Sequence, residues 1–360
     1  MEWVRGDTVG HGSFATVNLA IPKSQTPQIP PLMAVKSCGL SHSASLMSEK
    51  SILDELNNCP NVIRCFGDNY SFEKGEKLYN VLLEFASGGA LSDKIINSPD
   101  RRLPESDVTR YTRCILQGLN YIHKNGYVHC DIKLQNCLLF SCKDGRDDVV
   151  KIADFGLAKR GGVKRENKGF EFKGTPLYMS PEMVAGIELE APADIWALGC
   201  LVAEMVTGAP AWSHLPESGI PALLMRIGFG EELPEIPLKL SEEGKDFLKK
   251  CFVKDPRKRW TAEMLLNHPF VAVHGGDHEW STSPTTQFDF PDWESTQSSP
   301  TWSTTYLPSP EYSQISDTRF ECELNLSCGS LYTSPVDRIR QLVGNQRPDW
   351  SVSDSWVTVR

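Results

Sequence analysis

The sequence predicts an α+β fold with two lobes, a small strand-rich lobe over about residues 1–85 and a larger helical lobe over about residues 86–270. Two observations lead to this prediction. In the first lobe the hydrophobic residues alternate as in half-buried strands, whereas in the second they recur every three to four residues as in amphipathic helices. After residue 270 neither period continues, so residues 271–360 are predicted to form a separate tail.

The small lobe is predicted to contain four strands and one helix. Residues 21–31 hold four prolines and are predicted to be a surface connection, because proline removes a hydrogen bond from a sheet. The helix is predicted where Leu46, Ile52 and Leu53 recur at helical spacing, and it ends near Leu56. The strands are predicted at residues 3–9, 15–20, 32–36 and 79–85.

The large lobe is predicted to be mainly helical. Its clearest apolar stripe runs through Val108, Tyr111, Ile115, Leu119 and Ile122, which would share one face of a helix. The helices are predicted at residues 107–124, 194–207, 220–227 and 243–253.

The tail differs from the lobes in composition. The whole chain carries a net charge of −9, and residues 271–360 contribute −7 of it, with 12 acidic residues against 5 arginines and no lysine. Of these 90 residues 25 are Ser or Thr, which predicts a largely disordered regulatory or docking segment. The alternative is a small second domain, because five of the nine tryptophans lie there. The acidic balance argues against a nucleic-acid partner.

Cysteine usage and hydropathy bear on the compartment. The 11 cysteines show no CxxC pairs, a pattern that favours a reducing environment over a disulfide framework. No stretch approaches the roughly 18 apolar residues of a membrane span, and the first residues lack the apolar core of a signal peptide. We therefore expect a soluble, intracellular protein with no membrane span.

A glycine-rich turn joins the first two predicted strands, in the segment Gly10-His11-Gly12-Ser13-Phe14-Ala15-Thr16-Val17. Glycine has no Cβ, so the backbone of such a turn can approach and cover phosphate groups. Ala15 stands where the usual pattern has a third glycine, a small departure that leaves room for a nucleotide. By itself the turn is weak evidence, because glycine-rich hairpins are common.

Lys36 lies on the next predicted strand, where a lysine can hold phosphates as a point charge. A carboxylate is needed to orient its ammonium group. Glu49 is the best candidate, because it lies on the same helical face as Leu46 and Ile52. The alternative is a surface ion pair of little energetic value, but the position of both residues among the other motifs favours the functional interpretation.

Two further segments carry the decisive pattern. One is His-Cys-Asp-Ile-Lys-Leu-Gln-Asn, which ends at Asn136, and the other is Asp-Phe-Gly, which begins at Asp154, 23 residues after Asp131. Phosphoryl transfer needs a carboxylate beside the attacking hydroxyl and oxygen ligands that hold Mg²⁺ against the phosphates. Asp131 fits the first role, and Asn136 and Asp154 fit the second. Lys133 is expected to stabilise the transferring phosphoryl group.

These motifs, in this order and spacing, resemble those of the protein kinase superfamily over about residues 3–270. The resemblance implies the two-lobed kinase fold, with ATP as phosphoryl donor and Mg²⁺ as metal. The catalytic residues that it implies are Lys36, Glu49, Asp131 and Lys133, and the metal ligands are Asn136 and Asp154. The nucleotide-binding residues that it implies are Gly10, Gly12, Ala15, Val17, Ala34, Lys36, Leu83, Glu84, Ala86, Asn136 and Asp154.

The same resemblance assigns further roles. Leu83 takes the gatekeeper position, and residues 84–86 form a hinge that reads adenine through backbone groups. Lys133 and Thr175 resemble the serine/threonine branch of the superfamily. Three residues are expected to be structural: Asp194 as the anchor of the catalytic loop, and Glu182 with Arg259 as an ion pair.

One departure from the family pattern concerns regulation. The usual His-Arg-Asp is His129-Cys130-Asp131 here, and a cysteine cannot bind an activating phosphate as arginine does. Residues 157–174, the activation segment, contain no Ser, Thr or Tyr. We therefore expect this segment to be held ready without phosphorylation. A role for Cys130 as an oxidation switch is the less favoured alternative to an ordinary buried residue.

Several segments together resemble the compact plant MAP kinase kinase kinases of the MEKK-like group, whose kinase domain begins at the N-terminus. They are the catalytic loop at Asp131, the Lys-Ile-Ala-Asp-Phe-Gly-Leu-Ala-Lys segment around Asp154, and the helix that begins Asp194-Ile195-Trp196. The resemblance implies MAP kinase kinases as substrates, in stress or hormone signalling such as the abscisic acid response. It also implies upstream regulators, phosphatases or downstream MAP kinases as partners of the tail, and a cytoplasmic or nuclear location.

Three alternatives stay open at this point. A pseudokinase scaffold would be expected to lack Lys36, Asp131 or Asp154, and all three are present. A receptor-like cytoplasmic kinase usually differs after Thr175 and at Asp194. An adaptor that works only through the acidic tail would leave the complete set of reactive groups unexplained. Four Ser-Pro sites in the tail, at Ser283, Ser299, Ser309 and Ser334, suit modification by proline-directed kinases.

Overall fold

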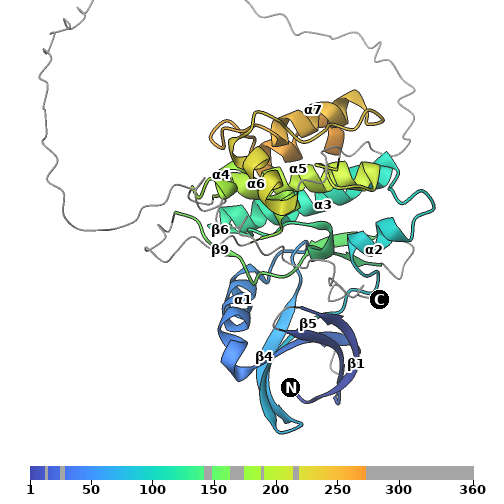
Figure 1. Cartoon of the computed structure of the whole chain (residues 1–360). Helices are drawn as coiled ribbons and strands as arrows, with labels where there is room; N and C mark the ends of the chain where they lie inside the picture. Colours follow the sequence, from blue (N-terminus) through green and yellow to red (C-terminus); the bar gives the residue numbers. More distant parts are fainter. Residues whose placement is uncertain are drawn as a thin grey trace, which may run out of the picture. The chain divides into compact units, whose positions relative to one another are not determined.

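A computed structural model describes residues 1–12, 15–24, 29–141, 148–162, 174–187, 190–213 and 219–272. The predicted tail lies outside the described residues from position 273 onward. A sheet with one helix, α1, lies at one end of the described domain, and the remaining helices lie at the other (Figure 1). The predicted α+β fold with a strand-rich and a helical lobe is confirmed.

The small lobe is a five-stranded antiparallel sheet with the strand order β1-β2-β3-β5-β4. Its strands are β1 (Trp3–His11), β2 (Thr16–Pro22), β3 (Met33–Gly39), β4 (Cys65–Glu73) and β5 (Glu76–Glu84). A short 3₁₀ turn, η1 (Leu40–His42), leads into α1 (Ser43–Leu56). Leu46, Ile52, Leu53 and Leu56 of α1 are buried, as their spacing predicts, and Glu49 is buried with them.

The large lobe is built mainly from helices. They are α2 (Leu91–Ile96), α3 (Glu105–Lys124), α4 (Pro181–Val184), α5 (Pro192–Thr207), α6 (Gly219–Phe229), α7 (Glu242–Cys251) and α8 (Ala262–Leu266), with a last 3₁₀ turn η4 (Pro269–Val271). Two small antiparallel pairs complete it, β6 (Tyr127–Val128) with β9 (Lys159–Arg160) and β7 (Cys137–Phe140) with β8 (Val149–Ile152). The 3₁₀ turn η2 (Leu134–Asn136) lies between β6 and β7 in sequence, and η3 (Pro176–Tyr178) lies between β9 and α4.

Helix α5 is the buried centre of this lobe. Twelve of its residues are buried, which its nearly continuous apolar sequence explains. It begins with Pro192 in the first turn, where a missing N–H costs nothing. It ends at Gly208, which has φ 76°, and a Cβ there would collide with the carbonyl oxygen of Arg101.

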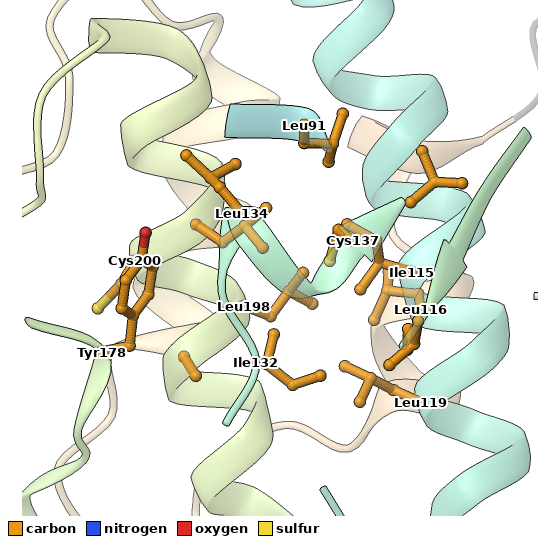
Figure 2. Packing of buried hydrophobic residues seen from close by; sticks show 14 of the residues in the cluster. Leu91, Ile115, Leu116, Leu119, Ile132, Leu134, Cys137, Tyr178, Leu198 and Cys200 are labelled. Carbon is orange, nitrogen blue, oxygen red and sulfur yellow. The ribbon is translucent and has the colours of Figure 1, made fainter. Parts of the chain in front are cut away.

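The segment that carries the catalytic residues lies on this core. Figure 2 shows Ile132 and Leu134 pointing into the space between α3 and α5. Both side chains are almost completely buried, at 1% and 2% exposure, as is Cys137 at 0%. Because these residues are fixed in the core, the polar residues that alternate with them are held at its surface.

The predicted helices and four predicted strands are all present, with ends that differ by a few residues. Two differences concern the sheet. Strand β4 (Cys65–Glu73) was not predicted, because Gly67 and the polar residues around it weaken the alternation. Pro22 was placed outside the sheet, but it is the last residue of β2 and pairs with Trp3. In the described ranges no helix is both long and apolar enough to cross a bilayer.

Candidate active site

The predicted pair of Lys36 and Glu49 is present, and Asp154 joins it. Lys36 Nζ lies 2.7 Å from Glu49 Oε2 and 2.9 Å from Asp154 Oδ1. Strand β3 supplies the lysine, α1 supplies Glu49, and the turn after β8 supplies Asp154. Glu49 also accepts a hydrogen bond from the backbone N–H of Phe155, at 3.3 Å. One ammonium group therefore ties the sheet, the helix and the Asp-Phe-Gly turn together.

The charges of this group are set by opposing effects. Burial by itself lowers the pKa of Lys36, but the carboxylates of Glu49 and Asp154 outweigh it and the pKa is raised. Burial raises the pKa of Asp154, but the ammonium group of Lys36 overrides this effect and lowers that pKa to about 2. Burial also raises the pKa of the Glu49 carboxyl, against the opposing effect of Lys36. Lys36 therefore keeps its proton at neutral pH.

Asp131 is the centre of a second group. Its Oδ1 accepts a hydrogen bond from Thr175 Oγ1 at 2.9 Å, and its Oδ2 lies 2.7 Å from Lys133 Nζ. Lys133 Nζ also donates to Thr175 Oγ1, at 3.0 Å. Asn136 Nδ2 donates to Oδ2 of the same aspartate, at 3.1 Å. These contacts fix the orientation of the Asp131 carboxylate before any substrate hydroxyl arrives.

His129 joins the two groups. The backbone N–H of Asp131 donates to His129 Nδ1 at 3.3 Å, so the ring proton is on Nε2, which lies 3.1 Å from the carbonyl oxygen of Ala153. The backbone N–H of Ala153 donates to the carbonyl oxygen of Asn136, at 2.9 Å. The histidine ring also packs edge-on against Phe155, with the ring centres 4.8 Å apart. The Asp-Phe-Gly turn and the catalytic loop are therefore held in one frame.

Asp194, at the start of α5, anchors this frame as predicted. Its two carboxylate oxygens accept the backbone N–H groups of His129 and Cys130, each at 2.9 Å. His123 Nε2 lies 2.9 Å from the same carboxylate. Burial raises the pKa of Asp194, but His123 and these hydrogen bonds prevail and the pKa is lowered. The contribution of His123 was not predicted, because only the fold brings the end of α3 beside α5.

The residues expected to bind the nucleotide lie on neighbouring strands and in the hinge. Gly10 of β1 pairs with Val17 of β2, and the N–H of Gly12 donates to the carbonyl oxygen of Ala15 at 2.7 Å. Ala34 of β3 pairs with Leu83 of β5, the expected gatekeeper. Glu84 ends β5, and Ala86 follows it in the hinge. Ser13 and Phe14, at the tip of the glycine-rich turn, lie outside the described residues.

The side chain of Glu84 is held by a residue that the sequence did not reveal. Lys151 Nζ of β8 lies 2.8 Å from Glu84 Oε1 and 2.6 Å from Oε2. The N–H of Glu84 donates to the carbonyl oxygen of Arg64, at 2.9 Å. Lys151 also lies over the ring of Phe140, 4.6 Å from its centre. With its side chain and its N–H occupied in this way, Glu84 offers only its backbone carbonyl oxygen to an adenine ring, as the hinge role inferred from the sequence requires.

We expect Lys151→Met to raise the KM for ATP by about three- to tenfold and to leave kcat nearly unchanged. Methionine keeps the apolar contact with Phe140 but removes both charge-assisted bonds to Glu84, so the hinge is less well fixed. Steady-state kinetics at varied ATP concentration measure the effect. Lys124→Met, which removes an exposed ion pair with Glu263, is the control. An unchanged KM in Lys151→Met would contradict this role of the lysine.

The residues expected to hold a divalent cation have the right donor chemistry. The amide N–H₂ of Asn136 is bonded to Asp131, so its carbonyl oxygen is the atom left for a cation. The carboxylate of Asp154 is ionised at neutral pH, and the side chain is 48% exposed. Within the described part of the chain no cluster of three or more His, Cys, Asp or Glu forms a metal site. These two oxygen donors would therefore hold the cation together with phosphate oxygens.

Cys130 occupies an apolar position beside Leu157 and Met183. It is buried at 8% exposure and belongs to a cluster with Val128 and Ala193, against which Leu157 and Met183 pack. Its backbone is left-handed, with φ 66°, and is fixed by the bond from its N–H to Asp194. Burial disfavours the oxidation-switch alternative, because reactive cysteines are usually accessible.

The predicted pair of Glu182 and Arg259 is also present. Arg259 Nη1 and Nη2 donate to the two oxygens of Glu182, at 2.6 and 3.0 Å. Both side chains are almost fully buried, at 4% and 0% exposure. The pair joins α4, which follows the loop at Thr175, to the segment before α8. Its contribution is to the shape of the large lobe rather than to chemistry.

Comparison with known proteins agrees with this geometry. The sequence pattern of the protein kinase domain matches residues 3–271. The chain belongs to the protein kinase family. It is 47% identical to mitogen-activated protein kinase kinase kinase 20 of Arabidopsis thaliana, with 100% of both chains covered.

Two further relatives from the same organism align with about three quarters of this kinase. Identity is 41% with mitogen-activated protein kinase kinase kinase 17, over 76% of this chain and 70% of the relative. Identity is 42% with mitogen-activated protein kinase kinase kinase 18, over 75% of this chain and 78% of the relative. The chain is therefore an ATP-dependent serine/threonine protein kinase, and its relatives are of the MAP kinase kinase kinase type.

The site supplies what the transfer of a phosphoryl group needs. Lys36, fixed by Glu49, presents a positive charge for the phosphates of ATP. In the roles that the sequence implies, Asp131 would accept the proton of a substrate hydroxyl, and Lys133, 2.7 Å from its carboxylate, would offset negative charge that develops during transfer. Asp154 and Asn136 would hold a divalent cation, which would supply positive charge to neutralise the phosphates. The protein contributes mainly positioning and electrostatic stabilisation.

Proposed function

We propose that this kinase phosphorylates MAP kinase kinases on serine or threonine, with Mg²⁺ as the metal of its nucleotide. The observation that carries the proposal is the 47% identity to a MAP kinase kinase kinase over the full length of both chains, tail included. A tail that aligns end to end supports a shared role beyond the catalytic step. A plant stress or hormone cascade, with abscisic acid as the first candidate signal, and a location in the cytoplasm or nucleus are parts of the same proposal.

The test is an in vitro panel of purified MAP kinase kinases as substrates, with a generic protein substrate beside them. We expect at least one member of the panel to be phosphorylated on Ser or Thr much faster than the generic substrate, and to become active toward its own MAP kinase. Phosphorylation of the generic substrate alone would contradict the proposed substrate class while leaving the kinase activity intact.

Two variants serve as controls for this panel. Lys36→Met removes the contact to Glu49 and Asp154 and should abolish the signal. Asp154→Asn should abolish phosphotransfer while preserving the fold, so any cellular output that survives in this variant would be due to a scaffold role. The complete set of Lys36, Asp131 and Asp154 supports the enzyme over the scaffold.

The activation segment is proposed to be ready without phosphorylation. Cys130 replaces a phosphate-binding arginine by an apolar contact with Met183 and Ala193. Two other contacts hold the first part of the segment, residues 157–162. Arg160 Nη2 lies 2.7 Å from Glu55 of α1, and the N–H of Gly162 donates to Glu190 Oε1 at 2.8 Å.

Phosphatase treatment of the purified kinase tests this point. We expect activity to fall by less than about twofold, because the contacts around Cys130 and Arg160 need no phosphate. Mass spectrometry before and after treatment shows whether phosphate was removed. A collapse of activity that maps to a site within residues 157–182 would contradict the proposal.

A further inference from the structure

The sheet of the small lobe carries a network of polar side chains that includes none of the expected nucleotide-binding residues. Arg5 of β1 is its centre. Its Nε and Nη2 donate to the two carboxylate oxygens of Glu73 on β4, each at 2.9 Å. The guanidinium group lowers the pKa of the Glu73 carboxyl. Since β1 and β4 are the two edge strands, this pair joins the opposite edges of a curled sheet (Figure 1).

The other donors of Arg5 reach the three inner strands. Nη1 donates to Ser37 Oγ of β3 at 2.9 Å and to Asn18 Oδ1 of β2 at 3.3 Å. Nη2 donates to Asn80 Oδ1 of β5, at 2.9 Å. These three acceptors are buried, at 3%, 8% and 0% exposure. All five N–H donors of one guanidinium group are therefore in use, and every strand of the sheet is connected to it.

One branch of the network leads to the hairpin of the glycine-rich turn. Asn18 Nδ2 donates to Thr8 Oγ1 at 2.8 Å and to the carbonyl oxygen of Gly6 at 3.3 Å. The pairing of β1 with β2 is irregular at this place, with register shifts between Arg5 and Thr8 and between Thr8 and Gly10. Where the backbone ladder is interrupted, it does not fix the register alone. The Asn18 amide bridges the interruption, with its oxygen toward Arg5 and its nitrogen toward β1.

We propose that Arg5 and Asn18 are positioning residues for the glycine-rich loop. They fix the register of the β1–β2 hairpin across its irregular stretch and thereby set the position of the backbone that covers the ATP phosphates. The turn begins at Gly10, two residues after Thr8, so a slip at the bridge moves it directly. This inference rests on the ATP-dependent kinase activity and is independent of which protein is the substrate.

The network has a second branch that serves as a matched comparison. Ser71 of β4 donates to Glu73 Oε1 at 2.7 Å and accepts from Asn80 Nδ2 at 3.0 Å. Its removal costs two hydrogen bonds of the same network but does not touch the hairpin, whereas Asn18→Leu removes two bonds to the hairpin and the bond from Arg5 Nη1. A purely structural network predicts similar consequences at both ends, whereas a positioning role predicts a change in nucleotide binding only at the Asn18 end.

The experiment compares Asn18→Leu, Thr8→Val and Ser71→Ala in the full-length kinase. ATP affinity is measured by equilibrium binding without protein substrate, KM and kcat with a generic protein substrate, and unfolding by a thermal scan. We expect Asn18→Leu to raise the Kd and KM for ATP by about three- to tenfold, with kcat at saturating ATP within about twofold of the wild type. Thr8→Val, an exposed and nearly isosteric change, should shift both constants in the same direction. Ser71→Ala should lower the unfolding temperature and leave the Kd and the KM for ATP unchanged.

An absence of any effect on nucleotide binding would overturn the inference. If Asn18→Leu, Thr8→Val and Ser71→Ala all leave the Kd and KM for ATP at the wild-type values, the network stabilises the sheet and does not position the loop. If Asn18→Leu fails to fold, the Kd and KM for ATP of Thr8→Val alone test the inference, and wild-type values would overturn it. A failure to phosphorylate MAP kinase kinases would not affect the outcome, because nucleotide binding is read without them.

Discussion

Asp131→Asn is expected to lower kcat by about 10²- to 10⁴-fold, the range that a positioned general base contributes. Asn has nearly the same shape, but its amide cannot accept the proton of a substrate hydroxyl. The charge that holds Lys133 at 2.7 Å is lost as well, and the acceptor of the Thr175 hydroxyl is weakened. The reduction should therefore appear in the chemical step rather than in nucleotide binding.

Steady-state kinetics at saturating ATP measure this effect, and equilibrium binding of ATP shows whether the nucleotide site is intact. We expect ATP affinity to stay within about threefold, because Lys36, Glu49 and Asp154 form a separate group. Asp100→Asn makes the same chemical change on the surface, where the side chain is 70% exposed, and should be neutral. A kcat for Asp131→Asn within tenfold of the wild type would show that another group takes the proton.

Arg259→Met is expected to lower the free energy of unfolding by about 3–5 kcal/mol, because it leaves a buried carboxylate without its partner. Glu182 is 4% exposed and has both oxygens bonded to this guanidinium group. Arg259 also donates to the backbone carbonyl oxygens of Val253 and Pro192, at 2.9 and 2.6 Å. Methionine fills much of the volume but replaces none of these donors.

Chemical denaturation of the purified kinase gives the free energy of unfolding for each variant. Arg257→Met is a close control, because this arginine is 89% exposed and lies two residues away; its effect should stay within about 0.5 kcal/mol. The double variant Glu182→Met/Arg259→Met should recover part of the loss, since no charge then stays buried alone. If Arg259→Met is no less stable than Arg257→Met, the pair does not hold the large lobe together.

Most of the chemistry could be predicted from the sequence, because the kinase motifs are short and local. Asp131, Lys133 and Asn136 lie within six residues, so one loop conformation brings them together, and alternation with buried Ile132 and Leu134 fixes that conformation. The contacts of Lys36 with Glu49, of Arg259 with Glu182 and of Asp194 with the catalytic loop were predicted and are present. The longer helices α1, α3, α5, α6 and α7 were predicted from apolar residues at helical spacing, whereas the short helices α2, α4 and α8 were not predicted.

What escaped prediction depends on residues far apart in the chain. Lys151 is an ordinary lysine on a short strand until the fold places it beside Glu84, 67 positions earlier. Arg5 and Glu73 are 68 positions apart, and nothing in either segment indicates that they meet. Strand β4 was missed for a related reason, since its polar face joins the network around Arg5 and so breaks the expected alternation.

The sequence by itself determined the family, the two-lobed fold, the reactive groups and the replacement of the phosphate-binding arginine by Cys130. All of these depend on residue identity at fixed local spacing. Only the tertiary structure decided how the sheet is closed, which side chain holds the hinge, and what surrounds Cys130. The physical reason is that hydrogen bonds and ion pairs between distant segments depend on the register and twist of the strands, which arise from the packing of the whole lobe rather than from any local pattern.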